Sequence, residues 1–372
     1  MSNKLASFDA LKGKRVFVTG HTGFKGSWLC LWLDALGCEV FGYALEAPTQ
    51  PSNFTVSGIE EVVTHSRIAD IRDAKELARS IDEFKPDLIM HLAAQSVVRH
   101  GYEAPIDTLS TNVMGTANVL EAVRKIGRPC SVLCVTSDKC YRNDEQAWGY
   151  RECDHLGESD PYGASKGAAE LVIRSYRKSY FPLSDIENHG VRLASARAGN
   201  VIGGGDWTGH GLIADCVRAF AEGREVELRN PKAQRPWQHV LQCLSGYLTV
   251  SALLLSGDDP RICSAWNFGP VNGDELPVHE VVDYLANYWP GSGWTDVSKG
   301  DAEHESQILR LSIDKAVWEL GWNPGWNVYQ SLDATANWFL EYFSNPEKMR
   351  EVCFSQIRQY EKVLFGEVGA SP

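Results

Sequence analysis

Short apolar runs alternate with amphipathic segments of helical length through the first half of the chain. Residues 15–19 form the first run, a helical pattern over 26–36 follows, and residues 39–45 are apolar again. Strands and helices that alternate in this way predict an α/β fold, in which a doubly wound parallel sheet has right-handed crossover connections. The expected strands are 15–19, 39–45, a weaker 62–69, 87–93, 131–136 and 191–198, and the expected helices are 26–36, 73–84, 105–126 and 161–180.

The character of the sequence changes after about residue 200. Three consecutive glycines stand at 203–205, and tryptophans are spread through mixed helical and short-strand segments beyond them. The chain has 372 residues, and at roughly 150 residues per domain it holds two domains, or one large α/β domain with an appended lobe. We predict a nucleotide-binding sheet domain over 1–200. Residues 201–372 would form mainly a smaller, mixed α/β substrate lobe, with some chain exchanged between the two.

Charge and hydropathy exclude several classes of partner. The chain carries 36 basic and 48 acidic residues, a net charge of −12, which disfavours attraction to nucleic acid or anionic lipid. Its longest apolar stretches, such as 29–33 and 251–255, are far shorter than the roughly 20 residues of a membrane span. Residues 1–11 show no secretion signal. We therefore expect a cytoplasmic protein that binds neither nucleic acid nor membrane.

The ten cysteines are scattered through apolar runs of a long chain without export features. This usage predicts reduced, buried thiols rather than disulfides. One loose cluster, formed by Cys130, Cys134, Cys140 and Cys153, lacks the paired C-x-x-C spacing of a zinc site. We expect no metal.

Three glycines follow the first expected strand at three-residue spacing. Gly20, Gly23 and Gly26, with Thr22 and Phe24 between them, let the backbone turn tightly and come close to a ligand. The helix that starts there offers free N–H groups and a positive dipole end to a pyrophosphate. Incidental glycines in a plain strand-turn-helix are the simpler alternative, but the position at the start of a βαβ pattern argues against it. The turn predicts a dinucleotide site in a Rossmann sheet.

The acidic residue that often binds the adenosine ribose is missing at the end of the second expected strand. Ala44 stands about where it should be, and Glu46 follows two residues later. A missing acid weakens the case for NAD over NADP, but no arginine stands nearby to bind a 2′-phosphate. We therefore favour NAD.

Tyr162 and Lys166 lie four residues apart in the expected helix 161–180. This spacing places both side chains on one face, where an ammonium can favour the phenolate of a tyrosine whose unperturbed pKa is about 10. Such a pair is suited to taking a proton while a hydride leaves for a bound nicotinamide. The same pair also arises by chance on ordinary amphipathic helices, so the interpretation depends on the motifs around it.

Six ordered motifs resemble those of the extended short-chain dehydrogenase/reductase superfamily, and the resemblance covers nearly the whole chain. The motifs are Gly20-x-x-Gly23-x-x-Gly26, Asp70-Ile71-Arg72-Asp73, His91-Leu92-Ala93-Ala94-Gln95-Ser96, Thr111-Asn112-Val113-x-Gly115-Thr116, Tyr162-x-x-x-Lys166 and Glu319-Leu320-Gly321-Trp322-x-Pro324.

The resemblance implies positions around the dinucleotide for several residues. Asp70 and Ile71 would flank the adenine, and Asn112 would support the site from the long helix. His91, on an apolar strand, is expected to be a core histidine without a chemical role. The stretch that would line the cofactor is Ala93, Ala94 and Gln95.

The residues after the expected strand 131–136 separate reaction types within the superfamily. Here they are Ser137, Asp138 and Lys139, a pattern similar to the nucleotide-sugar 4,6-dehydratases, because epimerases lack the acid directly after the serine. The resemblance implies that Ser137 assists Tyr162 at the sugar 4-hydroxyl and that Asp138 protonates the departing 6-hydroxyl. Lys139 replaces the commoner glutamate, and two roles stay open for it: base at carbon 5, or stabiliser of the enolate.

Residues 199–207 and 235–240, together with Lys139, resemble in particular the dehydratases that act on CDP-glucose. A CDP-hexose is the implied substrate, with Ser96 in its site. We expect Arg235 to bind the diphosphate, because a guanidinium binds two phosphate oxygens in one plane, and Asn200 to bond sugar or phosphate. Arg235 could instead pair with a structural carboxylate, and Asn200 could cap a turn.

Three other functions are weighed against this one. A nucleotide-sugar 4-epimerase uses the same Tyr/Lys pair, but Asp138 argues against it. A dehydratase acting on another NDP-hexose stays open. A dinucleotide-binding protein without catalysis is permitted by the fold, but it could dispense with Ser137, Tyr162 and Lys166.

The resemblance also implies a product and an assembly. The product would be CDP-4-keto-6-deoxyglucose, a precursor of deoxysugars in bacterial surface polysaccharide such as lipopolysaccharide O-antigen. Two copies would pair through helices 105–126 and 161–180 into a four-helix interface, giving a homodimer or a tetramer built from it.

Overall fold

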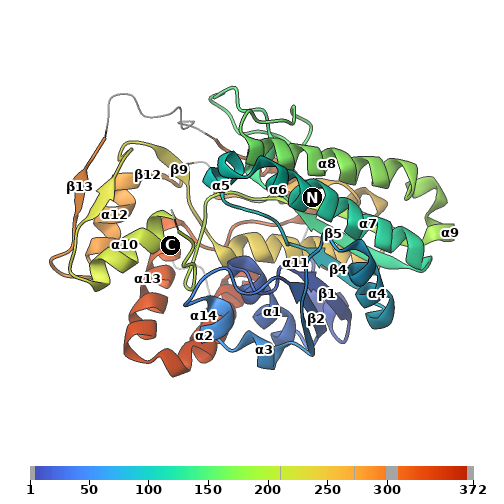
Figure 1. The fold of residues 1–372 in the computed structure, drawn as a ribbon, viewed down its shortest axis with the longest axis horizontal. Coiled ribbons are helices and arrows are strands. Elements are labelled where there is room, and N and C mark those ends of the chain that lie inside the picture. Colours follow the sequence, from blue (N-terminus) through green and yellow to red (C-terminus); the bar gives the residue numbers. More distant parts are fainter. Residues whose placement is uncertain (1–4, 210, 272, 299–308, 367–372) are drawn as a thin grey trace.

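A seven-stranded parallel sheet lies at the centre of the computed structural model, which describes residues 5–209, 211–271, 273–298 and 309–366 (Figure 1). The strands lie in the order β11-β6-β5-β4-β1-β2-β3. The chain starts in the middle at β1, moves to one edge, and then returns to build the other side from β4. That reversal opens a crevice beyond the carboxyl ends of β1 and β4. The strands are β1 (Arg15–Thr19), β2 (Glu39–Ala44), β3 (His65–Ile68), β4 (Leu88–His91), β5 (Cys130–Val135), β6 (Val191–Arg197) and β11 (Ala265–Asn267).

The two faces of the sheet carry two separate cores, which follow from the two-residue period of a strand. Within β1, Val16 and Val18 point into one core and Phe17 into the other. On the first face α1 (Phe24–Ala35) packs with α11 (Val240–Ser256), α13 (Val328–Ser344) and α14 (Met349–Leu364). On the second face lie α4 (Ala74–Phe84), α7 (Gly115–Ile126) and α8 (Pro161–Ser179) (Figure 1). The predicted doubly wound α/β sheet is confirmed.

Most predicted elements of the first half are present within one or two residues. The weak third strand is β3, and the expected helix 105–126 consists of α6 (Pro105–Leu109), a π-helical turn (Ser110–Met114) and α7. The prediction missed α5 (Val98–Glu103), together with the short helices α2 (Asn53–Val56), α3 (Ile59–Val62) and α9 (Ile186–His189).

The second half of the chain contributes to two places. Part of it forms small two-stranded sheets with α10 (Leu212–Ala221) and α12 (Val278–Ala286), at the left of Figure 1. However, α11 covers the main sheet and β11 extends it beyond β6. The division at residue 200 stays a prediction. The small sheets pair β7 (Val201–Ile202) with β10 (Gln238–His239), β8 (Val226–Leu228) with β13 (Trp294–Asp296), and β9 (Gln234–Pro236) with β12 (Glu275–Pro277).

All ten cysteines are free thiols, and all are buried except Cys38 and Cys153. The expectation of buried thiols is confirmed for the other eight. Among the residues that the structure describes, none of the helices has the length and apolar character needed to cross a bilayer. The same residues contain no group of three or more His, Cys, Asp or Glu side chains placed to hold a metal.

Candidate active site

The glycine turn forms a close-packed cradle at the carboxyl end of β1. Gly20 has a left-handed backbone (φ +80°), and a β-carbon there would lie 2.8 Å from the Ala93 nitrogen. A β-carbon on Gly26 would lie 2.0 Å from the Gly20 oxygen. Gly23 begins α1 without a side-chain cap, so the first N–H groups of this helix are available to an anion. Thr22 closes the turn by donating its hydroxyl to the Leu45 carbonyl oxygen at 2.9 Å.

The loop after β4 is fixed from two sides. The Thr19 hydroxyl oxygen accepts hydrogen bonds from the backbone nitrogens of Leu92 and Ala93, both at 3.1 Å. The Asn112 amide brackets Gln95, accepting from its backbone nitrogen and donating to its carbonyl oxygen at 2.9 Å each. Asn112 also donates to the Ser165 hydroxyl of α8 at 2.8 Å. The expected cofactor loop is therefore tied to α8.

Sequence reasoning overlooked Thr19, although a polar residue that ends a buried strand was a usable signal. Thr19 Oγ1 lies 2.7 Å from Nδ1 of His91, and Nε2 of His91 lies 3.1 Å from the Thr116 hydroxyl. Burial, with a smaller contribution from Lys166, lowers the pKa of His91 to about 3. His91 is thus a neutral core residue that positions the loop, as expected.

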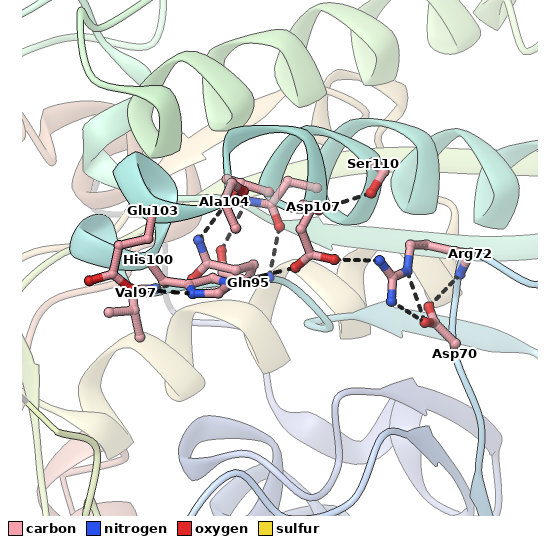
Figure 2. Close-up of polar contacts among 11 residues, drawn as sticks. Asp70, Arg72, Gln95, Val97, His100, Glu103, Ala104, Asp107 and Ser110 are labelled. Carbon is pink, nitrogen blue, oxygen red and sulfur yellow. Dashed lines mark hydrogen bonds and ion pairs between the residues drawn. The ribbon is translucent and has the colours of Figure 1, made fainter.

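The predicted adenine side of the site contains a chain of ion pairs, drawn in Figure 2. The Arg72 guanidinium binds Asp70 through Nε and Nη2, at 2.8 and 2.6 Å, and Asp107 of α6 through Nη1 at 2.5 Å. Hydrogen bonding to Arg72 lowers the pKa of Asp70, so this carboxyl is ionised at neutral pH. Ile71 is buried, and a β-carbon on Gly115 would lie 2.4 Å from its Cδ1.

Ser137, Asp138 and Lys139 form a tight turn directly after β5. Ser137 donates its hydroxyl to the Asp138 carboxylate at 2.9 Å, and the Lys139 backbone nitrogen donates to the same carboxylate oxygen at 2.9 Å. Ser137 and Asp138 are buried and Lys139 is half-buried. The Asp138 carboxylate is therefore held in one orientation by its two neighbours in sequence.

Tyr162 and Lys166 lie at the start of α8, which begins there because Asp160 caps the helix and accepts from the Tyr162 and Gly163 nitrogens. The Lys166 Nζ is 6.0 Å from the centre of the Tyr162 ring. Burial raises the pKa of Tyr162, and hydrogen bonding to Ser137 opposes that rise. Burial, and then repulsion from Lys25, lowers the pKa of Lys166 to about 8. The protein alone thus keeps the phenol protonated at neutral pH, opposite to the shift expected from the ammonium.

A buried ion pair between Glu170 of α8 and Arg197 of β6 connects the ends of β5 and β6. Glu170, one turn after Lys166, accepts from Arg197 at 2.8 and 3.0 Å and from the Thr136 hydroxyl at 2.6 Å. Ser195 donates to the same carboxylate at 3.0 Å. Glu170 thereby fixes the end of β5, which is followed by Ser137 and Asp138, relative to α8.

A cavity opens where β5, β6 and β11 end. Asp138, Gly199, Gln238, Glu275 and Arg310 are among the residues that line it. Arg310 donates to Glu275 at 3.0 Å. Sequence reasoning included Gln238 in the stretch 235–240 that carries the resemblance but gave it no role, and it missed Arg310, which lies in none of the motifs. The wall of the cavity therefore combines the Asp138 carboxylate, the Gln238 amide and the Arg310 guanidinium.

Three residues predicted for the substrate are absent from the wall of this cavity, although Asn200 and Arg235 each follow or precede a wall residue in sequence. Asn200 has a left-handed backbone (φ +50°), as an Asn in a turn often does, and its carbonyl oxygen accepts from the Gln238 nitrogen at 3.2 Å. Arg235 lies on β9 and donates to the Gln234 carbonyl oxygen at 3.0 Å. Ser96 is exposed just before α5. Their roles toward a substrate stay predictions.

A family model described as GDP-mannose 4,6 dehydratase matches residues 17–253. The chain belongs to this family of nucleotide-sugar 4,6-dehydratases. A CDP-glucose 4,6-dehydratase of Salmonella typhimurium is 48% identical over 327 residues, which cover 88% of this chain and 90% of that protein. The resemblance predicted from the motifs is confirmed.

Solved structures of similar proteins agree with the family in fold. The dTDP-glucose 4,6-dehydratase DesIV of Streptomyces venezuelae, solved with NAD and TYD bound, has a TM-score of 0.72 and 25% identity over 91% of this chain and 99% of its own. A UDP-glucose 4-epimerase of Thermus thermophilus, in complex with NAD, has a TM-score of 0.70 and 26% identity over 88% and 99%. NAD is thus the cofactor with which these relatives of the family were solved.

Proposed function

We propose that this chain converts CDP-glucose into CDP-4-keto-6-deoxyglucose and water, with NAD as its cofactor. The observation that carries the proposal is the 48% identity, over 88% of the chain, to a CDP-glucose 4,6-dehydratase. The buried Asp138, which lines the cavity and lies beside Ser137, supports it. The activity belongs in the cytoplasm and supplies deoxysugars for surface polysaccharides such as O-antigen.

The glycine cradle fits the phosphates of a dinucleotide. Gly20 and Gly26 leave no room for a β-carbon, so backbone alone meets a ligand there, and Gly23 opens the uncapped start of α1. Thr22 and Phe24 complete the turn. The adenosine would lie against Asp70 and Ile71, and the rest of the cofactor along Ala93, Ala94 and Gln95, which Asn112 supports.

The residues around Asp138 divide the reaction between them. Bound NAD would supply the hydride acceptor and donor that oxidation at sugar carbon 4 and reduction at carbon 6 need. Tyr162, with Ser137 and Lys166, removes the proton from the 4-hydroxyl. The phenolate that this step needs would be favoured by the positive charge of bound NAD, which opposes the burial that raises the pKa of Tyr162 in the protein alone. Asp138 gives a proton to the departing 6-hydroxyl. The ketone at carbon 4 acidifies the hydrogen on carbon 5, where Lys139 acts as base or stabilises the enolate.

Two cations of the second half would hold the diphosphate. Arg310 lines the cavity that contains Asp138, and a guanidinium binds two phosphate oxygens in one plane. Arg235, on the neighbouring β9, keeps its predicted place as a second phosphate ligand. Asn200 and Ser96 would bond the sugar and its phosphates from the ends of the flanking loops.

The exposed apolar side chains of α5, α6, the π-helical turn (Ser110–Met114) and α8 support a homodimer, or a tetramer built from it, through the predicted four-helix interface. Ile106 is 77% exposed, Tyr102 65%, Met114 56% and Leu171 55%, a concentration of apolar surface typical of interaction sites. In light scattering, Ile106→Glu and Leu171→Glu together should give a monomer, whereas Val271→Glu, at an exposed apolar residue outside these helices, should not change the mass.

A nucleotide-sugar 4-epimerase is the second candidate, because an epimerase of 26% identity shares the fold. Asp138 separates the two activities. Incubation with CDP-, dTDP-, GDP- and UDP-glucose should yield the alkaline absorbance of a 4-keto sugar with CDP-glucose. Asp138→Asn should abolish it. A 4-epimer formed without that absorbance would contradict the proposal, and turnover of another nucleotide alone would contradict its CDP specificity.

A further inference from the structure

The Gln238 side chain is fully buried, but only its amide nitrogen has hydrogen-bond partners. Its Nε2 donates to the carbonyl oxygens of Gly199 and Phe268, at 3.0 and 3.1 Å. Its Oε1 has no hydrogen-bond partner among the residues that the structure describes. Both amide hydrogens are therefore used and a strong acceptor is left over.

The orientation of this amide is determined by its surroundings. Turning it over would place Oε1 against the two carbonyl oxygens of Gly199 and Phe268, which offer no hydrogen. The amide nitrogen must therefore face those carbonyls, and the oxygen must face away from them. Gln238 belongs to the wall of the cavity that contains Asp138 and Arg310, and its Oε1 is closed off from solvent in the protein without a ligand.

A buried acceptor without a partner is unfavourable unless a ligand or water supplies a donor. On the proposed function, Asp138 engages the hexose 6-hydroxyl and Tyr162 the 4-hydroxyl, so the bound hexose would lie next to the cavity wall that Asp138 and Gln238 share. The hydroxyls at carbons 2 and 3 are the donors that the reaction does not consume. We infer that Gln238 Oε1 accepts a hydrogen bond from one of these two hydroxyls and so selects a hexose that carries it.

Gln356 provides a matched control. It is also a buried glutamine, its Nε2 donates to the Ala334 carbonyl oxygen at 2.8 Å, and its Oε1 also lacks a partner within the described part of the chain. It lies on α14, outside the wall of the cavity. Gln356→Met and Gln238→Met both remove buried amide hydrogen bonds, so both should lower the thermal midpoint. Only Gln238→Met should change how the sugar is recognised.

The test compares CDP-glucose with its 2-deoxy and 3-deoxy analogues, for the wild type and both variants. The wild type should use one analogue with kcat/KM lower by about tenfold to a hundredfold, because the analogue leaves Oε1 unpaired. Gln238→Met should use that analogue and CDP-glucose about equally, and Gln356→Met should discriminate like the wild type.

Two results would overturn the inference. The wild type could treat both analogues like CDP-glucose, as it would if only water occupied Oε1, a result that needs no variant to fold. Gln238→Met could also keep the full discrimination. Turnover of a different NDP-glucose would contradict the CDP proposal alone, and the same comparison would then use deoxy analogues of that nucleotide. If the wild type turned over none of the NDP-glucoses, both the proposed function and the inference about Gln238 would be rejected.

Discussion

Gly199 lies directly against the Asp138 carboxylate. A β-carbon built on Gly199 would lie 1.9 Å from Asp138 Oδ2 and 2.1 Å from its Cγ, well inside van der Waals contact. The backbone conformation at Gly199 is ordinary, so the need for glycine here is one of space alone. Only glycine therefore fits at position 199, just after β6, while the Asp138 carboxylate keeps its place just after β5.

Replacing Gly199 by Ala should displace the Asp138 carboxyl and slow the dehydration. A misplacement of about 1 Å at a reacting group can lower the rate about a hundredfold, so we expect kcat to fall by that order, with NAD binding unchanged. Rates and NAD affinity should be measured beside Gly293→Ala, where the new β-carbon would meet only Glu225 Oε1 at 3.9 Å. An unchanged kcat in Gly199→Ala would show that Asp138 tolerates displacement.

The Glu170–Arg197 pair should contribute strongly to stability. Both side chains are only 3% exposed, and Glu170→Gln would leave the Arg197 charge buried without its counter-charge. Such a loss costs about 3–5 kcal/mol of the free energy of unfolding, which denaturant titration would measure. Glu222→Gln, in a pair with 61% and 59% exposed side chains, should leave the midpoint almost unchanged. Equal effects of the two variants would contradict a special role for the buried pair.

Buried His91 should make the protein less stable in acid. Burial lowers its pKa to about 3, whereas an unfolded histidine titrates near 6.5. Between these values the unfolded chain binds more protons, so stability falls as pH falls from about 6.5 toward 3, by up to about 1.4 kcal/mol per pH unit.

His91→Gln should remove this contribution and flatten the dependence of unfolding free energy on pH between 6 and 4. His65→Gln, at an exposed position on β3, should leave the slope as in the wild type. Parallel curves for the wild type and His91→Gln would mean that His91 is protonated in the folded protein.

The sheet and the cofactor cradle were predictable because both depend on local sequence. Apolar periodicity locates β1 to β6, and Gly20 and Gly26 are needed wherever a backbone turns this tightly. Contacts between distant segments were not predictable. Gln238 and Arg310 reach the cavity only because residues far apart in the chain converge where β5, β6 and β11 end, and no spacing in the sequence encodes that meeting. The raised pKa of Tyr162 likewise depends on burial, which the four-residue spacing to Lys166 does not reveal.

Lys139 can be assigned to one of its two roles by a pair of substitutions. Its backbone nitrogen holds the Asp138 carboxylate at 2.9 Å, a contact that any side chain at this position keeps. Lys139→Met should therefore preserve the turn and lower kcat about a hundredfold or more, within the range expected for a lost acid–base group. Exchange of solvent deuterium into carbon 5 then tests the base role, although loss of an enolate stabiliser would slow exchange as well, so a slower exchange calls for the second substitution. If exchange in Lys139→Met matched the wild type, the base would have to be another residue.

Lys139→Glu completes the experiment, since glutamate can accept a proton but cannot stabilise a negative enolate. If Lys139 is the base, Lys139→Glu should recover much of the exchange that Lys139→Met loses. If Lys139 stabilises the enolate, Lys139→Glu should be at least as slow as Lys139→Met, because its carboxylate repels the developing charge. Thermal midpoints within error of the wild type in both variants would show that the two rates report chemistry and not folding.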